Sequence, residues 1–353
     1  MRNTILFLMI GLYSTRLSAA IFVVNNNVNS PSVYTTTTVA ISAANAGDTI
    51  YLTGSTLGYG DLAITKPLTI VGAGANPQKQ LPYIAIVGNV TMTASLANVK
   101  VSGLYISGSF SLANSTSNFD LEYCFFSAGT VQLNNSCNNI KVSNCIFLTY
   151  GRNLDGFDPC GGYYGGCSNL LIQNCVFNGV VAGLNITGTV IQNNIFLRNA
   201  DCFEGTNVIN NGGCYTVSYI NSATISNNIF YRSNPTNFTG GCAFNNNISY
   251  HPSATFAAMP GSGNLDNTDP QFVNFPAAGA NFSYAYDFHL SPASPGHLNG
   301  SDGKDVGLYG GSFPVSINGE VYNMPMIRQM NISSTNVQPN GNINVKVRST
   351  KSR

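Results

Sequence analysis

Residues 137–147 (CNNIKVSNCIF) and 167–177 (CSNLLIQNCVF) share one pattern: apolar residues alternate, an Asn-Cys pair follows, and a phenylalanine ends the segment. Other segments carry the same pattern wholly or in part, namely 96–106, 116–126, 186–196, 220–230 and the weaker 239–249. The seven segments begin 20, 21, 30, 19, 34 and 19 residues apart. A recurring unit of about 20 residues with alternating apolar positions predicts a stacked β-solenoid.

Stacking is required because one coil cannot bury its own inward face. Coils about 4.8 Å apart would pair each strand with the next and place equivalent residues in columns. Asparagine suits such a column, since it tolerates left-handed turns and its amide both donates and accepts hydrogen bonds. One column is expected to hold Leu104, Cys124, Cys145, Cys175, Asn194, Asn228 and Asn247. Inward residues are expected at Val99, Val101, Ile140, Val142, Val190 and Ile191.

Two further stretches carry a family resemblance. Residues 33–74, with GDTI and KPLTIVGAG, resemble the opening segment of right-handed parallel β-helix proteins of the pectin-lyase-like superfamily. This resemblance implies a short helix near residues 37–46 that caps the solenoid. Residues 269–311, with DPQFV, DFHLSPASPG and DGKDVGLYGG, resemble the closing segment of secreted β-helix proteins common in Bacteroidetes, and are expected to end the solenoid.

The predicted architecture is therefore all-β. A right-handed parallel β-helix domain with its caps would occupy residues 21–314, and a C-terminal β tail would occupy residues 315–353. The resemblance specifies the fold rather than an activity, because the superfamily contains lyases, hydrolases, epimerases and non-catalytic adhesins.

Composition excludes several function classes. Only 8% of the 353 residues are charged, where about 25% is usual, and 47 residues are asparagine. A net charge of +1 argues against a nucleic-acid partner, because long-range attraction to nucleic acid requires a basic protein. The 44% content of hydrophobic residues is enough to bury a core and argues against disorder.

Residues 1–20 have the layout of a signal peptide. A short apolar run, 5–12, follows Met1 and Arg2, and Ser18-Ala19-Ala20 supplies small residues at positions −3 and −1 if cleavage follows Ala20. The run is too short to cross a membrane as a helix. We expect a protein that is secreted or held at the cell surface, without a membrane span.

Nine cysteines are an odd number, so at least one thiol is free or pairs with another chain. Cysteines stacked in neighbouring coils are close enough to form a disulfide, and the alternative is that they remain free thiols in the core. The preferred disulfide is Cys202–Cys214, and the geometrically allowed pairs are Cys137–Cys167 and Cys124–Cys145.

Charged residues between positions 148 and 232 all follow the phenylalanine that ends a repeat. Two insertions, 148–166 and 197–219, are expected to leave the same turn and to form one polar flank. Tyrosine faces stack on sugars, arginine pairs with uronate carboxylates, and carboxylates act as acid and base or bind Ca²⁺. The candidate binding residues are Arg152, Tyr163, Tyr164, Arg198 and Arg232, and the catalytic candidates are Asp155, Asp158, Asp201 and Glu204.

Three interpretations of this flank remain open: exposed loops without a function, a non-catalytic site for a glycan or protein partner, and a catalytic site. Pectate-lyase-like catalysis requires a basic residue beside calcium-binding carboxylates on the strand face, and the coil strands are expected to be nearly uncharged. No cofactor is expected. Ca²⁺ at residues 264–269 or 302–305 is the exception to consider, although turn-forming Asp and Asn explain both loops.

The sequence therefore predicts an exported scaffold that binds a polysaccharide or a cell-surface protein. The alternative is a polysaccharide lyase or glycoside hydrolase that acts on an anionic polysaccharide at the 148–166/197–219 flank.

The C-terminal region adds two expectations. His289 is expected to pack within the closing segment rather than to serve in a His-based site. Residues 315–322 are expected to form a hairpin around Asn318-Gly319, and residues 343–347 a strand that packs along the solenoid or is donated to a partner.

Overall fold

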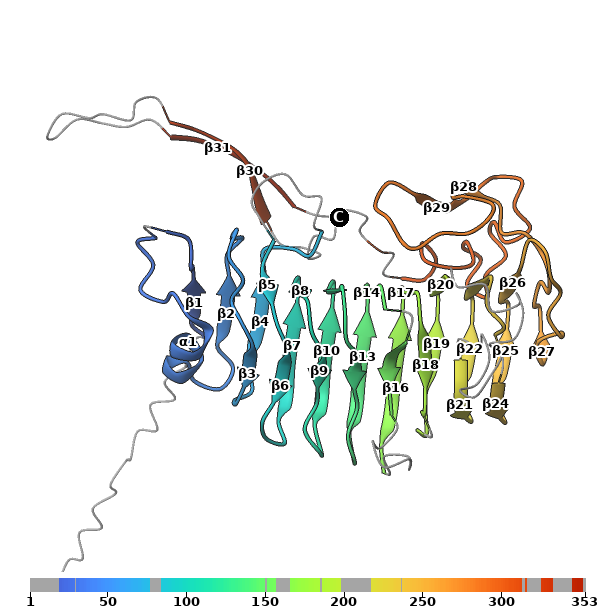
Figure 1. Ribbon diagram of the computed structural model, residues 1–353, viewed down its shortest axis with the longest axis horizontal. Coiled ribbons are helices and arrows are strands. Elements are labelled where there is room, and N and C mark those ends of the chain that lie inside the picture. Colours follow the sequence, from blue (N-terminus) through green and yellow to red (C-terminus); the bar gives the residue numbers. More distant parts are fainter. Residues whose placement is uncertain are drawn as a thin grey trace, which may run out of the picture.

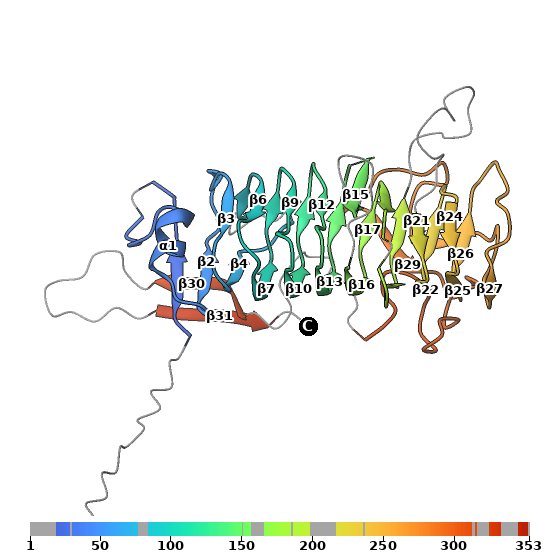
Figure 2. The same cartoon turned by 90° about the horizontal axis from the view of Figure 1, so that it is seen from below.

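The computed structural model describes residues 19–28, 30–76, 84–149, 151–156, 166–184, 186–197, 217–235, 237–312, 315, 325–332 and 345–351. Three parallel sheets, here called A, B and C, run along the molecule (Figures 1 and 2). Each coil contributes one strand to sheet A, then one to sheet C, then one to sheet B. This arrangement confirms the predicted right-handed parallel β-helix.

Sheet A contains, in spatial order, β1 (Ile21–Val24), β2 (Thr49–Leu52), β4 (Thr69–Gly72), β7 (Ala97–Ser102), β10 (Ser117–Glu122), β13 (Asn138–Ser143), β16 (Ser168–Gln173), β19 (Val190–Gln192), β22 (Thr224–Ser226), β25 (Ala243–Asn245) and β27 (Gly261–Ser262). Sheet B contains β3 (Leu62–Ile64), β6 (Val90–Met92), β9 (Phe110–Ser111), β12 (Val131–Gln132), β15 (Arg152–Asp155), β18 (Val180–Ala182), β21 (Val217–Asn221) and β24 (Asn237–Gly240). Sheet C contains β5 (Ile86–Val87), β8 (Tyr105–Ile106), β11 (Phe125–Phe126), β14 (Ile146–Phe147), β17 (Val176–Phe177), β20 (Ile195–Leu197), β23 (Ile229–Tyr231) and β26 (Ile248–Tyr250).

The repeated asparagine makes the sharp turn between sheet A and sheet C. Asn144, Asn174, Asn193 and Asn227 have φ angles of 54°, 50°, 56° and 57°, which lie in the left-handed region that asparagine tolerates. Gly103 takes the same place in an earlier coil, with φ of 70°. The turn explains why the motif needs asparagine immediately before its buried Cys or Asn.

The residue after that turn forms the predicted column inside the solenoid. The Oδ1 atom of Asn228 accepts the backbone N–H of Asn194 at 3.0 Å, and Asn247 Oδ1 accepts that of Asn228 at 3.0 Å. Asn264 extends the ladder by accepting from Asn247 at 3.0 Å. On the other side, Asn194 Oδ1 accepts the N–H of Cys175 at 2.9 Å. The amides of Asn194, Asn228 and Asn247 therefore each have hydrogen-bond partners in the coils on both sides, as buried polar groups require.

A second column consists of stacked phenylalanines. Neighbouring ring centroids lie 4.6, 4.9, 5.2 and 4.9 Å apart, and the ring planes are within 16° of parallel. The rings belong to Phe126, Phe147, Phe177, Phe196 and Phe230. One inward prediction was wrong, because Val190 aligns with Leu171 on the outer face of sheet A and Ile191 alone enters the core.

Of the two alternatives left open for the stacked cysteines, the structure has free thiols, at Cys124, Cys137, Cys145 and Cys167. The Cys137 thiol donates to the carbonyl of Ala113, and the thiols of the other three likewise donate to backbone carbonyls. The Cys202–Cys214 prediction lies outside the described residues.

Helix α1 (Thr37–Ala43) covers the first coil, as the resemblance implied. Thr36 caps its first turn by accepting the N–H of Val39, and the Lys66 ammonium donates to the carbonyls of Ile41, Ser42 and Ala44 at its other end. These contacts satisfy backbone groups that a helix end otherwise leaves unpaired.

The opposite end of the solenoid differs from the expectation. Phe256 and Met259 are buried there, and Met259 belongs to the core of the solenoid. Asn267 holds this loop by bonding both the N–H and the carbonyl of Phe256, while Asp266 accepts the N–H of Met259 at 3.0 Å. Segment 264–269 therefore fixes the end loop through the hydrogen bonds of Asp266 and Asn267, and this role explains its polar residues without a Ca²⁺ ion.

The closing segment lies on the side of the solenoid instead of covering its end (Figure 1). Its strands β28 (Phe272–Asn274) and β29 (Asp287–Leu290) pair antiparallel. Asn174 donates to the carbonyls of Leu308 and Gly310, which anchors the returning chain to the turns between sheets A and C. The outer face of sheet C is apolar because this segment covers it, and the two form a second hydrophobic cluster.

The tail forms its own antiparallel pair, β30 (Pro325–Ile332) and β31 (Val345–Lys351). The predicted strand at 343–347 is thus confirmed in part, but it pairs with β30, and within the described residues neither strand joins a solenoid sheet. The hairpin expected at 315–322 lies almost wholly outside the described residues, so it stays a prediction, as does donation of a strand to a partner.

Candidate functional site

The first predicted insertion contains a solenoid strand. Arg152 and Asp155 are the ends of β15, which pairs with β12 and β18. Asp155 is 7% exposed and forms an ion pair with Arg152, Nη1 to Oδ2, of 3.0 Å. Asp155 is therefore held in the wall of the solenoid, where the sequence had predicted a loop.

The two insertions also leave different turns, which corrects the prediction of one shared flank. Residues 157–165 lie between β15 of sheet B and β16 of sheet A, whereas residues 198–216 lie between β20 of sheet C and β21 of sheet B. The sequence could not show this, because a strand as short as β15, with four residues, has no pattern that separates it from a loop.

Arg232 has a structural contact instead of a place on an exposed flank. It is 9% exposed, and its Nη1 donates to the carbonyl of Ala278 in the closing segment. Burial lowers the pKa of its guanidinium. The hydroxyl of Tyr231 donates to Ala277 beside it, at 2.9 Å. The remaining candidates lie outside the described residues and stay predictions, namely Asp158, Tyr163, Tyr164, Arg198, Asp201 and Glu204.

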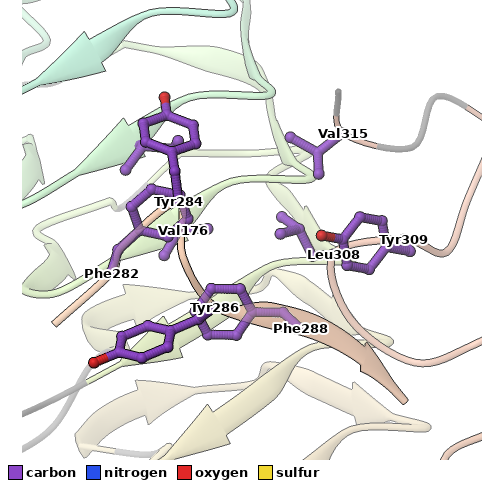
Figure 3. A pocket seen from close by; sticks show the side chains of 9 residues that line it. Val176, Phe282, Tyr284, Tyr286, Phe288, Leu308, Tyr309 and Val315 are labelled. Carbon is purple, nitrogen blue, oxygen red and sulfur yellow. The ribbon is translucent and has the colours of Figure 1, made fainter. Parts of the chain in front are cut away.

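An aromatic pocket lies where the closing segment crosses sheet C (Figure 3). Its empty volume, including the open space at its mouth, is about 330 Å³. Figure 3 shows the hydroxyl of Tyr309 turned toward the middle of the pocket and that of Tyr286 pointing away from it. The pocket is lined by Ile146, Val176, Phe282, Tyr284, Tyr286, Phe288, Leu308, Tyr309 and Val315.

A polar pair adjoins this pocket. The rings of His289 and Tyr309 stack with centroids 3.6 Å apart and planes 7° from parallel. Asp287 Oδ1 lies 2.6 Å from His289 Nδ1, and the two side chains are 44% and 50% exposed. His289 is therefore presented to solvent, although the sequence had suggested that it packs inside the closing segment.

The ionisation of the groups around the pocket follows from their contacts. Partial burial opposes ionisation of Asp287, but hydrogen bonds from the backbone and ring of His289 hold its pKa below the usual value. Burial raises the pKa of Tyr309, and the nearby Asp287 carboxylate adds to the rise. At neutral pH the site thus presents a carboxylate and a neutral phenol, and the carboxylate orients the ring of His289.

Sequence reasoning missed a charged group on the outer face of sheet A. Glu122 Oε2 lies 2.7 Å from Lys100 Nζ, and Glu122 Oε1 lies 2.7 Å from Lys141 Nζ, with Asp120 in register between the two lysines. Burial alone would raise the pKa of Glu122, but the hydrogen bonds from both lysines lower it. The expectation of nearly uncharged strands was wrong. Lys-x-Ser, Asp-x-Glu and Lys-x-Ser occur at one register of successive repeats, which was the available signal.

The second acidic loop is also explained by turn formation. Asp302 accepts the N–H groups of Lys304 and Gly311, and Asp305 accepts that of Leu298 while lying 2.8 Å from His297 Nδ1. Within the described ranges, no three His, Cys, Asp or Glu side chains come together as a metal site would require. The described part of the chain also has no helix of the length and hydropathy needed to cross a bilayer.

Comparisons with known proteins concern the fold. No protein-family model and no curated sequence matches the chain. A rhamnogalacturonan lyase structure is similar with a TM-score of 0.43 and 13% identity, over 66% of this chain and 74% of that one. Pectate lyase Pel9A is similar with a TM-score of 0.46 and 15% identity, over 85% of this chain and 97% of its own. Neither likeness assigns an activity. The three parallel sheets themselves make this chain a parallel β-helix, as its sequence predicted.

Proposed function

We propose that the protein is an exported scaffold that binds a glycan without transforming it, and that the aromatic pocket beside Asp287 and His289 holds one sugar ring. The observation that carries the proposal is the combination of apolar ring faces with an exposed polar pair at one site. Ring faces complement the C–H faces of a sugar, and a few convergent polar groups fix its orientation.

The polar pair suits binding better than bond cleavage. Glycoside hydrolysis ordinarily uses two carboxylates that flank the scissile bond. Among the described residues beside the pocket, Asp287 is the carboxylate in position, and it is engaged by His289. A carboxylate can accept a hydrogen bond from a sugar hydroxyl, and an imidazole nitrogen can donate a hydrogen bond to a sugar hydroxyl or accept one from it.

A glycan array followed by calorimetry with the strongest binder tests this proposal. We expect His289→Ala to weaken binding about tenfold, the equivalent of about 1.4 kcal/mol, as the loss of a hydrogen bond from an ordered group would. His297→Ala is the matched control, because His297 contacts Asp305 at 2.8 Å in a comparable pair and does not line the pocket. A wild-type protein that binds no glycan, or equal effects of the two variants, would contradict the proposal.

A second candidate function is a polysaccharide lyase on the outer face of sheet A, favoured by the basic and acidic side chains brought together there. Lys100 or Lys141 would serve as the base. Both side chains are, however, engaged in ion pairs with Glu122 at 2.7 Å. An assay for unsaturated uronates from anionic polysaccharides, with Lys100→Met and Lys141→Met as variants, separates this function from binding alone.

A further inference from the structure

A buried carboxylate, that of Asp48, directly precedes β2, at the end of the solenoid that α1 covers. Figure 1 shows α1 at this end, beside β1 and β2. Asp48 is 5% exposed. Its Oδ1 accepts the backbone N–H of Ala20 at 2.7 Å, and its Oδ2 accepts that of Asn45 at 2.7 Å. These two hydrogen bonds lower the pKa of Asp48, so the side chain is ionised at neutral pH.

This carboxylate has no ion-pair partner within 4.0 Å among the described residues. The nearby Lys66 ammonium is directed to the carbonyls at the end of α1, at 3.0, 2.8 and 2.7 Å. Buried charges in proteins are ordinarily paired, because removal from water is costly for an isolated ion. Asp48 is thus a buried anion held by two backbone nitrogens, those of Ala20 and Asn45, each at 2.7 Å.

Ala20 also bonds to the solenoid through its backbone oxygen. Its carbonyl accepts the N–H of Thr49 at 2.8 Å, and β1 begins at the next residue. Cleavage after Ala20, which small-residue spacing favours, would remove both the donor to Asp48 and the acceptor for Thr49. Cleavage one bond earlier would keep both contacts and leave Ala19 as the small residue before the cut.

We propose that maturation cuts the bond between Ala19 and Ala20, and that the new α-ammonium group of Ala20 forms an ion pair with Asp48. An endopeptidase of the signal-peptidase class would add water across the bond. The water oxygen joins the carbonyl carbon of Ala19, the C–N bond breaks, and the released amine of Ala20 takes up a proton. An ion pair then replaces the present hydrogen bond, in which only the acceptor is charged.

The ion pair has a distinct pH signature. An α-amino group ordinarily has a pKa of about 7.7–8.0, and a carboxylate partner raises it in the folded state. A group whose pKa is raised on folding stabilises the protein fully below its unfolded pKa. That stabilisation is lost as the pH rises through the folded value. The proposed pair therefore predicts a loss of stability above about pH 8 that depends on both the free terminus and Asp48.

Intact mass and N-terminal sequencing of the exported protein provide the first test. We expect the mature chain to begin with Ala20. A chain that begins at Ile21, or one that retains residues before Ala20, overturns the proposal.

Thermal unfolding provides the second test and compares two forms, each as wild type and as Asp48→Asn. One form begins at Ala20, and the other keeps a short uncharged extension, Gly-Ser-Gly, before Ala20. At pH 7 we expect the Ala20 form to unfold at least about 2 °C higher than the extended form. This difference should disappear at pH 10 and in Asp48→Asn, because either change removes one member of the pair. Equal Tm values for the two wild-type forms at pH 7, or a difference that persists in Asp48→Asn, would show that no ion pair forms. If Asp48→Asn does not fold, the two wild-type forms still decide the matter.

Discussion

Replacement of Tyr284 by phenylalanine should raise the stability of the free protein. The Tyr284 hydroxyl is buried and has no hydrogen-bond partner among the described residues. Burial also raises its pKa, as expected for a phenol removed from water. Phenylalanine would keep the ring contacts, in which centroids lie 6.1 Å from Phe125 and 4.9 Å from Phe282. Only the hydroxyl would change.

The magnitude follows from the cost of burying an unpaired hydroxyl. Protein mutational data place that cost at about 1–3 kcal/mol, so Tyr284→Phe should increase the free energy of unfolding by about 1–2 kcal/mol. Urea denaturation with linear extrapolation measures it, and an unchanged m-value would show that the unfolded state is unaffected.

Tyr59→Phe is the matched control with the opposite sign. The Tyr59 hydroxyl lies 2.9 Å from the carbonyl of Thr53 and 3.1 Å from that of Val24. Its removal should cost about 1–2 kcal/mol, because a bonded hydroxyl is lost and a carbonyl is left unpaired. If Tyr284→Phe lowers stability as much as Tyr59→Phe does, then the Tyr284 hydroxyl has a partner in solution and the reasoning fails.

Three further changes test the solenoid and its surface. Asn228→Ala should cost about 3–4 kcal/mol in urea denaturation and should expose the Asn194 amide to hydrogen exchange, because the Asn228 amide also donates to two buried carbonyls; unchanged protection of that amide would refute the ladder. Phe177→Ala should cost about 3–5 kcal/mol, since it leaves a cavity between two stacked rings, and a thermal scan that finds no change in Tm would contradict the stacked core. Glu122→Gln should flatten the dependence of Tm on pH between about 3 and 6. The pKa of Glu122 is lowered on folding, so the stability that this carboxylate contributes is present above its usual pKa of 4.5 and is lost as the pH falls. A variant with the wild-type dependence of Tm on pH would show that Glu122 contributes no such stability.

The amino-acid sequence alone determined the fold, because each coil finds its partners about 20 residues away in a copy of itself. The register of the repeats places Asn194 over Asn228 and Phe147 over Phe177, and the structure confirms both columns. Local chemistry was sufficient here. Asparagine adopts the left-handed turn that the repeat requires, and alternation separates the inner from the outer residues of a strand.

The candidate site depended on tertiary structure, since it joins segments that no repeat relates. Asn174 binds Leu308 across 134 positions, and this contact helps to lay the closing segment over sheet C instead of over the open end. Short strands such as β15 have no local sequence pattern that marks them as solenoid strands. The sequence therefore predicted an exposed loop at Asp155, where the structure has a strand. A periodic pattern determines contacts between neighbouring coils. The docking of one long segment on a distant apolar face depends on the whole surface, which exists only after the coils have stacked.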